Sequence, residues 1–192
     1  GTGLAFRARV EKIDNFIVAG SIDKPYANYG ESQKNIHLVI GLIKGKRMDM
    51  AIEKSVEFGI KSIHPVLFER SIKKTLNPER LTKIIVSSAK QTGRSIFPEL
   101  KKPVKFLEWI EAYQDRNCFA CHFEAKSKIE NVVSSQTDDI MIIVGPEGDF
   151  SANEIALLKK YETPLVNLGP RRLRSESACI SAIITASNII EG

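Results

Sequence analysis

Apolar positions along the chain fall into short runs that alternate with amphipathic segments. Runs of four to eight mainly apolar residues are typical of strands buried on both faces of a parallel sheet. They lie at residues 36–43, 60–67, 117–123, 140–144 and 165–168. Helical spacing of apolar residues predicts helices at residues 47–58, 78–91, 104–113, from 151 onward and at 176–191. Strands that alternate with helices predict an α/β fold with right-handed crossovers.

The N-terminal part has a different pattern. In residues 1–22, polar and apolar residues alternate loosely on both sides of a turn at Asp14 and Asn15. This pattern predicts two short strands. A polar stretch with Pro25 and Gly30 follows and is typical of a linker. We therefore divide the chain into residues 1–24, a linker at 25–34, and a larger domain at 35–192.

Two predicted strands end in a Gly-Pro corner, the first at Gly145 and Pro146 and the second at Gly169 and Pro170. Ligands of parallel sheets bind outside the carboxyl ends of the strands. Glycine lets the backbone turn sharply and approach a ligand, whereas proline stiffens the loop. The two corners predict a pre-shaped pocket lined by backbone groups, although each alone would also suit an ordinary turn.

Composition narrows the class of protein. Lys and Arg exceed Asp and Glu by 28 to 23, a mild basic excess that permits an anionic partner. No apolar run approaches the length of a membrane span, and the first residues do not resemble a signal peptide. Cys118 and Cys121 would point to opposite faces of a strand, so we expect no metal site. We expect a soluble cytoplasmic protein.

The last predicted helix is apolar on nearly all sides, with small residues at its few polar positions. Such a helix must be buried on several sides. Burial against both the sheet and a second copy of the chain would satisfy this requirement, and burial in a single core is the simpler alternative.

Four segments together resemble one family. GPEGDFS at residues 145–151 and LGPRRLRSESA at 168–178 resemble the C-terminal signature of the RsmE family, the 16S rRNA uridine-N3 methyltransferases of the SPOUT class. AIEKSVEFGIKSIHPVLFERS at 51–71 and AKQTGRSIFPELKKP at 89–103 resemble two further blocks in the expected order. The resemblance spans about residues 35–191.

The resemblance implies a parallel sheet flanked by helices with a C-terminal trefoil knot, a homodimer, and S-adenosylmethionine as cofactor. It implies methylation of N3 of a specific uridine in the 16S rRNA of the small ribosomal subunit. Residues 1–24 would be the remnant of a PUA-like RNA-binding β-barrel. Neither a metal ion nor a membrane is required.

The resemblance also implies site residues. We expect the cofactor to be held by Gly145, Pro146, Glu147, Gly148, Leu168, Gly169, Leu173, Arg174, Ser177 and Ala178. Arg174 and Arg171 would stabilise the uracil anion, and Glu176, or a water that it orders, would act as the general base. RNA contacts are expected from Arg70, Lys73, Gln91 and Arg94, and His122 and Glu124 are further candidates for the pocket.

Two positions depart from the family pattern. Asp149 stands where a second glycine is usual, and Arg172 stands where an aliphatic residue is usual. These departures and the short N-terminal part motivate an alternative, a non-catalytic RNA-binding or ribosome-assembly factor with the same fold. Another alternative is a SPOUT enzyme that modifies tRNA or a ribose 2′-oxygen. A phosphate-binding hydrolase is a weaker one, since GPEG lacks the P-loop lysine.

Overall fold

The structure is a computed structural model that describes all residues 1–192. Its strands are β1 Leu4–Ile13, β2 Val18–Ala27, β3 Asn35–Gly41, β4 Ser62–Leu67, β5 Glu99–Leu100, β6 Val104–Lys105, β7 Cys118–Cys121, β8 Asp139–Val144 and β9 Leu165–Val166. Its helices are α1 Gly45–Glu57, α2 Pro78–Gln91, α3 Phe106–Ala112, α4 Ala152–Lys160 and α5 Ser175–Glu191, with a 3₁₀ turn η1 at Ile129–Asn131.

The larger domain is a parallel sheet in the order β5-β4-β3-β8-β7-β9, with β6 also paired to β4. Every pairing in this sheet is parallel. The parallel α/β sheet predicted from the apolar runs is therefore confirmed. Strand β8 lies between β3 and β7, so the carboxyl ends of three long-separated segments meet at one edge.

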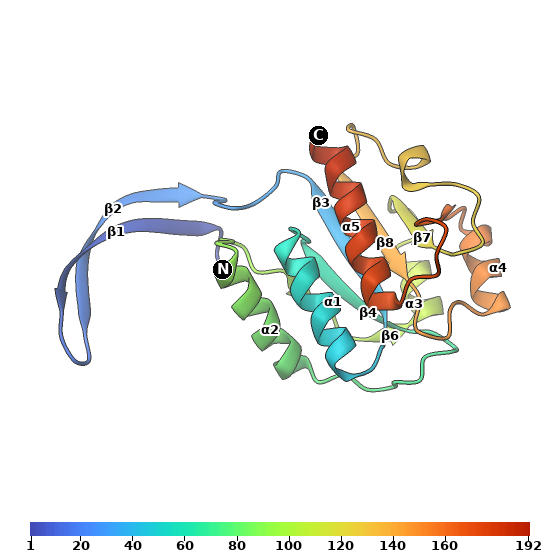
Figure 1. Cartoon of the computed structure of the whole chain (residues 1–192), viewed down its shortest axis with the longest axis horizontal. Helices are drawn as coiled ribbons and strands as arrows, with labels where there is room; N and C mark the ends of the chain where they lie inside the picture. Colours follow the sequence, from blue (N-terminus) through green and yellow to red (C-terminus); the bar gives the residue numbers. More distant parts are fainter.

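Helices cover both faces of the sheet. Alternating residues of β3 show this, because Leu38 and Ile40 belong to a core cluster of 27 buried residues and Val39 to a second cluster of 11. The larger cluster includes side chains of α1, α2 and α5, and the smaller one includes side chains of α3 and α4. Figure 1 shows α1, α2 and α5 side by side on one face.

Strands β1 and β2 form an antiparallel hairpin that projects away from the larger domain (Figure 1). The two predicted N-terminal strands are therefore confirmed. Strand β2 continues to Ala27, where Ala27 pairs with Leu4, so Pro25 lies within the hairpin although we placed it in the linker. Proline is tolerated there because a two-stranded ribbon has free edges.

The base of the hairpin and the residues that follow it are anchored to the larger domain. The Gly3 amide donates to the Ser95 carbonyl, and the Ser95 amide donates to the Tyr29 carbonyl, each at 3.0 Å. A Cβ at Gly30 would lie 2.8 Å from the Gly93 carbonyl oxygen, so only glycine permits this approach. No helix of the structure has the length and apolar character needed to cross a membrane.

Candidate functional site

A cavity of about 370 Å³ opens at the carboxyl ends of β7, β8 and β9. Three loops form most of it, at residues 121–123, 145–149 and 168–174, and α1 and α5 complete it. The lining residues are Arg47, Cys121, His122, Phe123, Val144, Gly145, Pro146, Glu147, Gly148, Asp149, Leu168, Gly169, Arg171, Arg172, Leu173, Arg174, Ser175 and Ala178. The cavity thus lies where the two Gly-Pro corners predicted a pocket.

Close backbone approach shapes the loop at residues 145–150. A Cβ at Gly148 would lie 2.8 Å from Arg70 Cβ and 3.0 Å from the Arg70 carbonyl oxygen. Arg70 Nη1 donates to the carbonyls of Gly148 at 3.3 Å and Phe150 at 3.1 Å. Arg70, which we predicted to contact RNA, therefore holds this loop in the structure.

The start of α4 fixes the other end of the same loop. Ser151 and Glu154 form a capping box, in which Ser151 N donates to Glu154 Oε2 at 2.8 Å. Glu154 Oε1 also accepts from the Glu69 amide at 2.7 Å, which the sequence pattern did not indicate. A single buried carboxylate thus ties the end of β4 to the end of the loop.

Asp149 connects all three loops. Its backbone has φ of 61°, a left-handed conformation that Asp tolerates better than most residues. Its Oδ1 accepts from the Phe150 amide at 2.8 Å and lies 3.5 Å from His122 Nδ1. Its Oδ2 accepts from Arg172 at 2.9 Å, and the Arg172 guanidinium lies 5.9 Å from the centre of the Phe123 ring.

The loop after β9 is tied to the loop after β7. Asn167 Nδ2 donates to the Phe123 carbonyl, and Asn167 Oδ1 accepts from the Gly169 amide at 2.7 Å. Gly169 has φ of 123°, which favours glycine, so the second Gly-Pro corner needs this residue. The amide of His122 donates to the Val166 carbonyl at 2.9 Å.

One end of the cavity carries an exposed arginine beside two largely buried carboxylates. Arg47, in the first turn of α1, places Nη1 3.6 Å from Glu147 Oε1 and Nε 3.9 Å from Glu176 Oε1. Glu147 Oε1 also accepts from the Lys44 amide at 3.2 Å. The second oxygens of Glu147 and Glu176 are buried without a hydrogen-bond partner, which is costly for a carboxylate. His122 Nδ1 is also buried without a hydrogen-bond partner.

The cysteine that lines this cavity is a poor nucleophile. Burial raises the pKa of the Cys121 thiol to about 12, so it stays protonated at neutral pH. Cys118 lies beside the smaller core cluster and Cys121 within the larger one, so they face opposite sides of the sheet as predicted. No three His, Cys, Asp or Glu side chains gather where they would hold a metal ion.

Most of the predicted cofactor and catalytic residues come together. Lining residues include Gly145, Pro146, Glu147, Gly148, Leu168, Gly169, Arg171, Leu173, Arg174 and Ala178, and also His122. Ser177 is exposed on α5 and is not among the lining residues. Glu176 is buried beside Arg47 rather than in the lining, and Glu124 projects into solvent.

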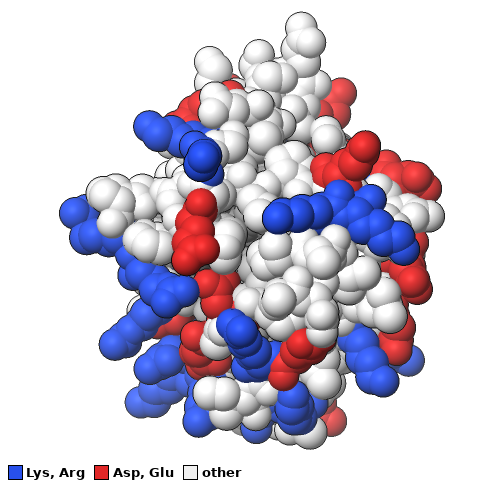
Figure 2. Space-filling model, turned by 90° about the vertical axis from the view of Figure 1, so that its right-hand side faces the viewer, with Lys and Arg blue, Asp and Glu red and all other residues white.

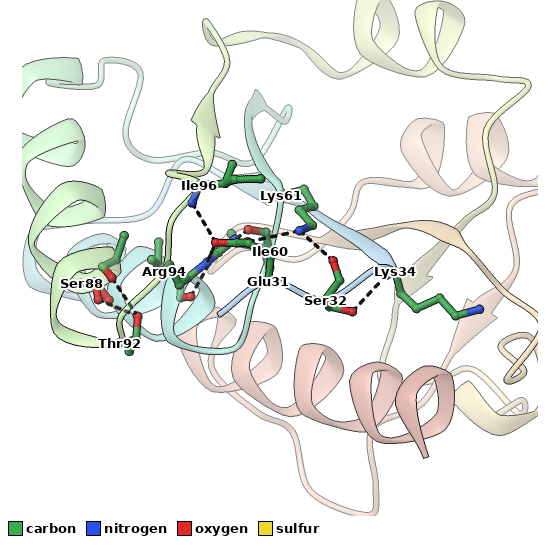
Figure 3. A network of polar contacts seen from close by, with 11 residues as sticks. Glu31, Ser32, Lys34, Ile60, Lys61, Ser88, Thr92, Arg94 and Ile96 are labelled. Carbon is green, nitrogen blue, oxygen red and sulfur yellow. Dashed lines mark hydrogen bonds and ion pairs between the residues drawn. The ribbon is translucent and has the colours of Figure 1, made fainter. Parts of the chain in front are cut away.

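The predicted RNA-contacting residues are dispersed. Lys73 is exposed on the segment before α2, and Gln91 is exposed at the end of α2. Arg94, which we predicted to contact RNA, is not available to do so, because its side chain is only 3% exposed. Its guanidinium donates to Glu31 and to the carbonyls of Val56 and Ile60 (Figure 3).

The sequence reasoning missed several lining residues, among them Arg47, Phe123 and Asp149, which links the loops. Arg47 follows β3, and only the order β3-β8-β7 brings it to the loop after β8. The available signal was its place shortly after an apolar strand, since such positions face ligands in parallel sheets.

Figure 2 shows basic and acidic side chains interspersed over the face opposite the hairpin.

The sequence of this chain matches a known protein family. Residues 30–187 match the family model described as an RNA methyltransferase domain. The chain is 33% identical to ribosomal RNA small subunit methyltransferase E of Buchnera aphidicola, over 95% of this chain and 74% of that protein. It is 28% identical to the protein of the same name from Bacillus subtilis, over 82% of this chain and 68% of that protein.

Solved structures give the same result. Ribosomal RNA small subunit methyltransferase E from Neisseria gonorrhoeae, bound to S-adenosyl methionine, superposes with a TM-score of 0.85. It is 27% identical, and the match covers 98% of this chain and 80% of that one. A protein from Legionella pneumophila in complex with the bound cofactor SAM has a TM-score of 0.84 at 32% identity, with the same coverage.

Proposed function

Because this chain belongs to the RNA methyltransferase family and resembles its small-subunit rRNA methyltransferase E members, we propose that it methylates small-subunit rRNA. The methyl donor is S-adenosylmethionine, and the acceptor is N3 of a specific uridine in 16S rRNA. The observation that carries the proposal is the cavity at the ends of β7, β8 and β9, in a chain similar to methyltransferases of known structure with this cofactor bound.

The cavity fits such a cofactor. Its volume of about 370 Å³ lies within the ~300–1,000 Å³ range of small-molecule sites. Gly145, Gly169 and Leu168 present backbone groups and apolar surface suited to a flat heterocycle, and Leu173 and Ala178 add apolar contacts. When bound, the cofactor supplies a methyl group on a sulfonium.

Arg174 and Arg171 supply the electrostatic part of catalysis in this proposal. Both line the cavity, and their side chains are exposed on the loop that leads into α5. Uracil N3 must lose its proton before it attacks, and the negative charge then spreads to the neighbouring oxygens. A guanidinium placed at such an oxygen stabilises this charge. Glu176 is buried behind Arg47, so its action as a base goes through an ordered water.

The finer features of the fold are part of the same proposal. The loop at residues 167–174 and α5 form a C-terminal trefoil knot, and residues 1–24 belong to a PUA-like RNA-binding β-domain. A homodimer is supported by Ile180 and Ile184, one turn apart on α5, which are only partly buried in a single copy. The protein works in the cytoplasm, where its rRNA substrate is assembled.

RNA binding extends beyond the cavity. Lys73 and Gln91 are exposed and are available to contact the RNA backbone, and Arg70 presents the loop at residues 145–150. The target base must leave its stack to reach the cavity, because N3 lies on the edge used in base pairing.

Methyl transfer from radiolabelled S-adenosylmethionine tests the function. The acceptors are small subunits that lack 3-methyluridine, free 16S rRNA and tRNA, and the product nucleoside is identified by chromatography. We expect label in 16S rRNA as 3-methyluridine, and at saturating cofactor a loss of about 100-fold or more in turnover for Arg174→Ala. Arg80→Ala, a surface arginine on α2 outside this cavity, is the matched control.

Other outcomes select the alternatives. Label in tRNA or at a ribose oxygen would favour a different methyltransferase of the same fold. Cofactor binding without label in any acceptor would locate the defect in RNA binding. Absence of both cofactor binding and label would contradict the proposal and favour a non-catalytic RNA-binding factor.

A further inference from the structure

The cavity has two chemically different ends, and the strand order fixes which is which. Apolar side chains come from the end of β7 and from the segments after β7 and β9, at Cys121, Phe123, Leu168 and Leu173, and Arg171, Arg172 and Arg174 border them. The opposite end lies toward β3 and α1, on the other side of β8, where Arg47 and Glu147 line the cavity. A ligand that fills the cavity therefore needs an apolar, flat part and a charged part.

The charged end has unused hydrogen-bonding capacity of both signs. Glu147 Oε1 accepts from the Lys44 amide, but Glu147 Oε2 is buried without a partner. The Arg47 side chain is 44% exposed and reaches the two carboxylates only at 3.6 and 3.9 Å, beyond hydrogen-bond length. One carboxylate oxygen thus lacks a donor, and one guanidinium lacks acceptors at good geometry.

Glu176 contacts Arg47 from outside the cavity lining. Its side chain is 9% exposed and is absent from the cavity lining, and its Oε1 faces Arg47 Nε. A buried carboxylate attracts the guanidinium and limits its rotamers, so Glu176 acts as a positioning residue for Arg47.

We propose that Arg47 and Glu147 form a subsite for the zwitterionic amino-acid end of the methyl donor. The Glu147 carboxylate accepts from the α-ammonium group, and Arg47 donates to the α-carboxylate. This inference rests on the proposed function and deepens it, because it orients the cofactor with its heterocycle toward β7 and β9. Opposite charges at the two positions match a zwitterion, whereas a simple anion would meet the Glu147 carboxylate.

The orientation has a consequence for ligand selection. A nucleoside thioether without the amino-acid end satisfies the apolar end of the cavity but leaves Arg47 and Glu147 without partners. Charged hydrogen bonds of this kind contribute strongly to affinity, and a site built for them discriminates against ligands that lack them.

Calorimetric binding of two ligands tests the subsite. S-adenosylhomocysteine carries the amino-acid end, and 5′-methylthioadenosine lacks it. We expect Arg47→Gln to weaken binding of S-adenosylhomocysteine at least tenfold and to change binding of 5′-methylthioadenosine less than twofold. Glu147→Gln should show the same selective loss, and Arg47→Lys should retain part of the preference. Lys46→Gln, an exposed neighbour on α1 outside the lining, is the control.

Each alternative outcome is informative. Equal weakening of both ligands by Arg47→Gln would show a general effect on the cavity and would overturn the subsite. Unchanged binding of both ligands would overturn it too, and would transfer the carboxylate to Arg171 or Arg174. If the unmodified protein binds neither ligand, the proposed function fails as well, so the two failures are distinguishable.

Discussion

The Asp149 carboxylate accepts a hydrogen bond from the Arg172 guanidinium at 2.9 Å, and this pair joins two loops of the cavity. Both residues depart from the pattern of the family that the sequence resembles, one in place of glycine and the other in place of an aliphatic residue. Arg172 also lies over the Phe123 ring, so the third loop is part of the same contact. The two departures form one joint contact at the cavity.

Substitution of Asp149 should separate its backbone role from its side-chain role. At φ of 61° alanine has no polar group to offset the strain, and glycine has no strain. We expect Asp149→Ala to lower the free energy of unfolding by about 1 kcal/mol more than Asp149→Gly does. Urea denaturation measures both, and Arg172→Ala, which removes the ion pair and the contact with the Phe123 ring but leaves the Asp149 backbone unchanged, serves as the comparison. Equal stability of the alanine and glycine variants would contradict this account.

Local signals predicted the elements that depend on local interactions. Helix α2 begins and ends where predicted, because the Asn77 side chain accepts from the Arg80 amide and Pro78 occupies the first turn. Strands β5 and β6 have two residues each and no apolar run, so no pattern indicated them. Their pairing with β4 is set by tertiary contacts alone.

The part of the site formed by the glycine and proline loops was predictable from the sequence. The contacts between segments that follow neighbouring strands were not. The Gly-Pro corners located the cavity, whereas the approach of Arg47 depends on which strands are neighbours. Arg94 follows a glycine in a polar turn, which is typical of a surface residue. Its burial depends on Glu31, 63 positions away in the chain, and no short-range pattern reports such a partner.

The buried pair of Glu31 and Arg94 should contribute strongly to stability. Both side chains are nearly inaccessible, at 2% and 3%, and Arg94 Nη2 donates to Glu31 Oε2 at 2.8 Å. Arg94→Met leaves Glu31 buried with fewer partners, so we expect a loss of about 3–5 kcal/mol in the free energy of unfolding. Arg80→Met, which breaks an exposed pair with Asp49, should cost less than about 1 kcal/mol.

The same carboxylate predicts a pH dependence. Burial by itself raises the pKa of Glu31, but the hydrogen bonds from Arg94 and the Ile96 amide outweigh it and hold the pKa below 4.5. A lowered pKa stabilises the fold above the unfolded value of 4.5, and this contribution is lost as the pH falls further. Glu31→Gln should remove that part of the acid dependence. An identical acid profile in the variant would exclude Glu31 as its source.

His64 should produce a second pH dependence at higher pH. Burial lowers its pKa from 6.5 to about 4, and Trp109 Nε1 donates to its Nδ1 at 3.3 Å, which requires a neutral ring. Because the unfolded chain binds the proton more tightly, stability is complete above pH 6.5 and falls toward pH 4. The loss is on the order of 3 kcal/mol.

Denaturation between pH 4 and 7 measures this slope, and His64→Gln should reduce it. His37 leaves a residual slope of the same sign, because burial lowers its pKa too. It shares the hydroxyl of Ser62 with His64, at 2.7 and 2.8 Å, so the two histidines belong to one hydrogen-bonded group. A slope unchanged by the substitution would assign the titration to other groups.

Gly148 should control the shape of the cavity more than the stability of the fold. A Cβ there would lie 2.8 Å from Arg70 Cβ and 3.0 Å from its carbonyl oxygen, so the loop must move. The residue is exposed, and few core contacts depend on it. We expect Gly148→Ala to weaken S-adenosylhomocysteine binding at least tenfold and to lower the free energy of unfolding by less than about 1 kcal/mol.

Calorimetry and urea denaturation of the same preparation separate the two effects. Gln136→Ala, a substitution on an exposed loop before β8, controls for loop changes elsewhere. Loss of affinity with retained stability would show that the approach of Gly148 to Arg70 sets the geometry of the binding loop. Unchanged affinity would show that the loop relaxes around a Cβ, and the glycine requirement at this position would then be refuted.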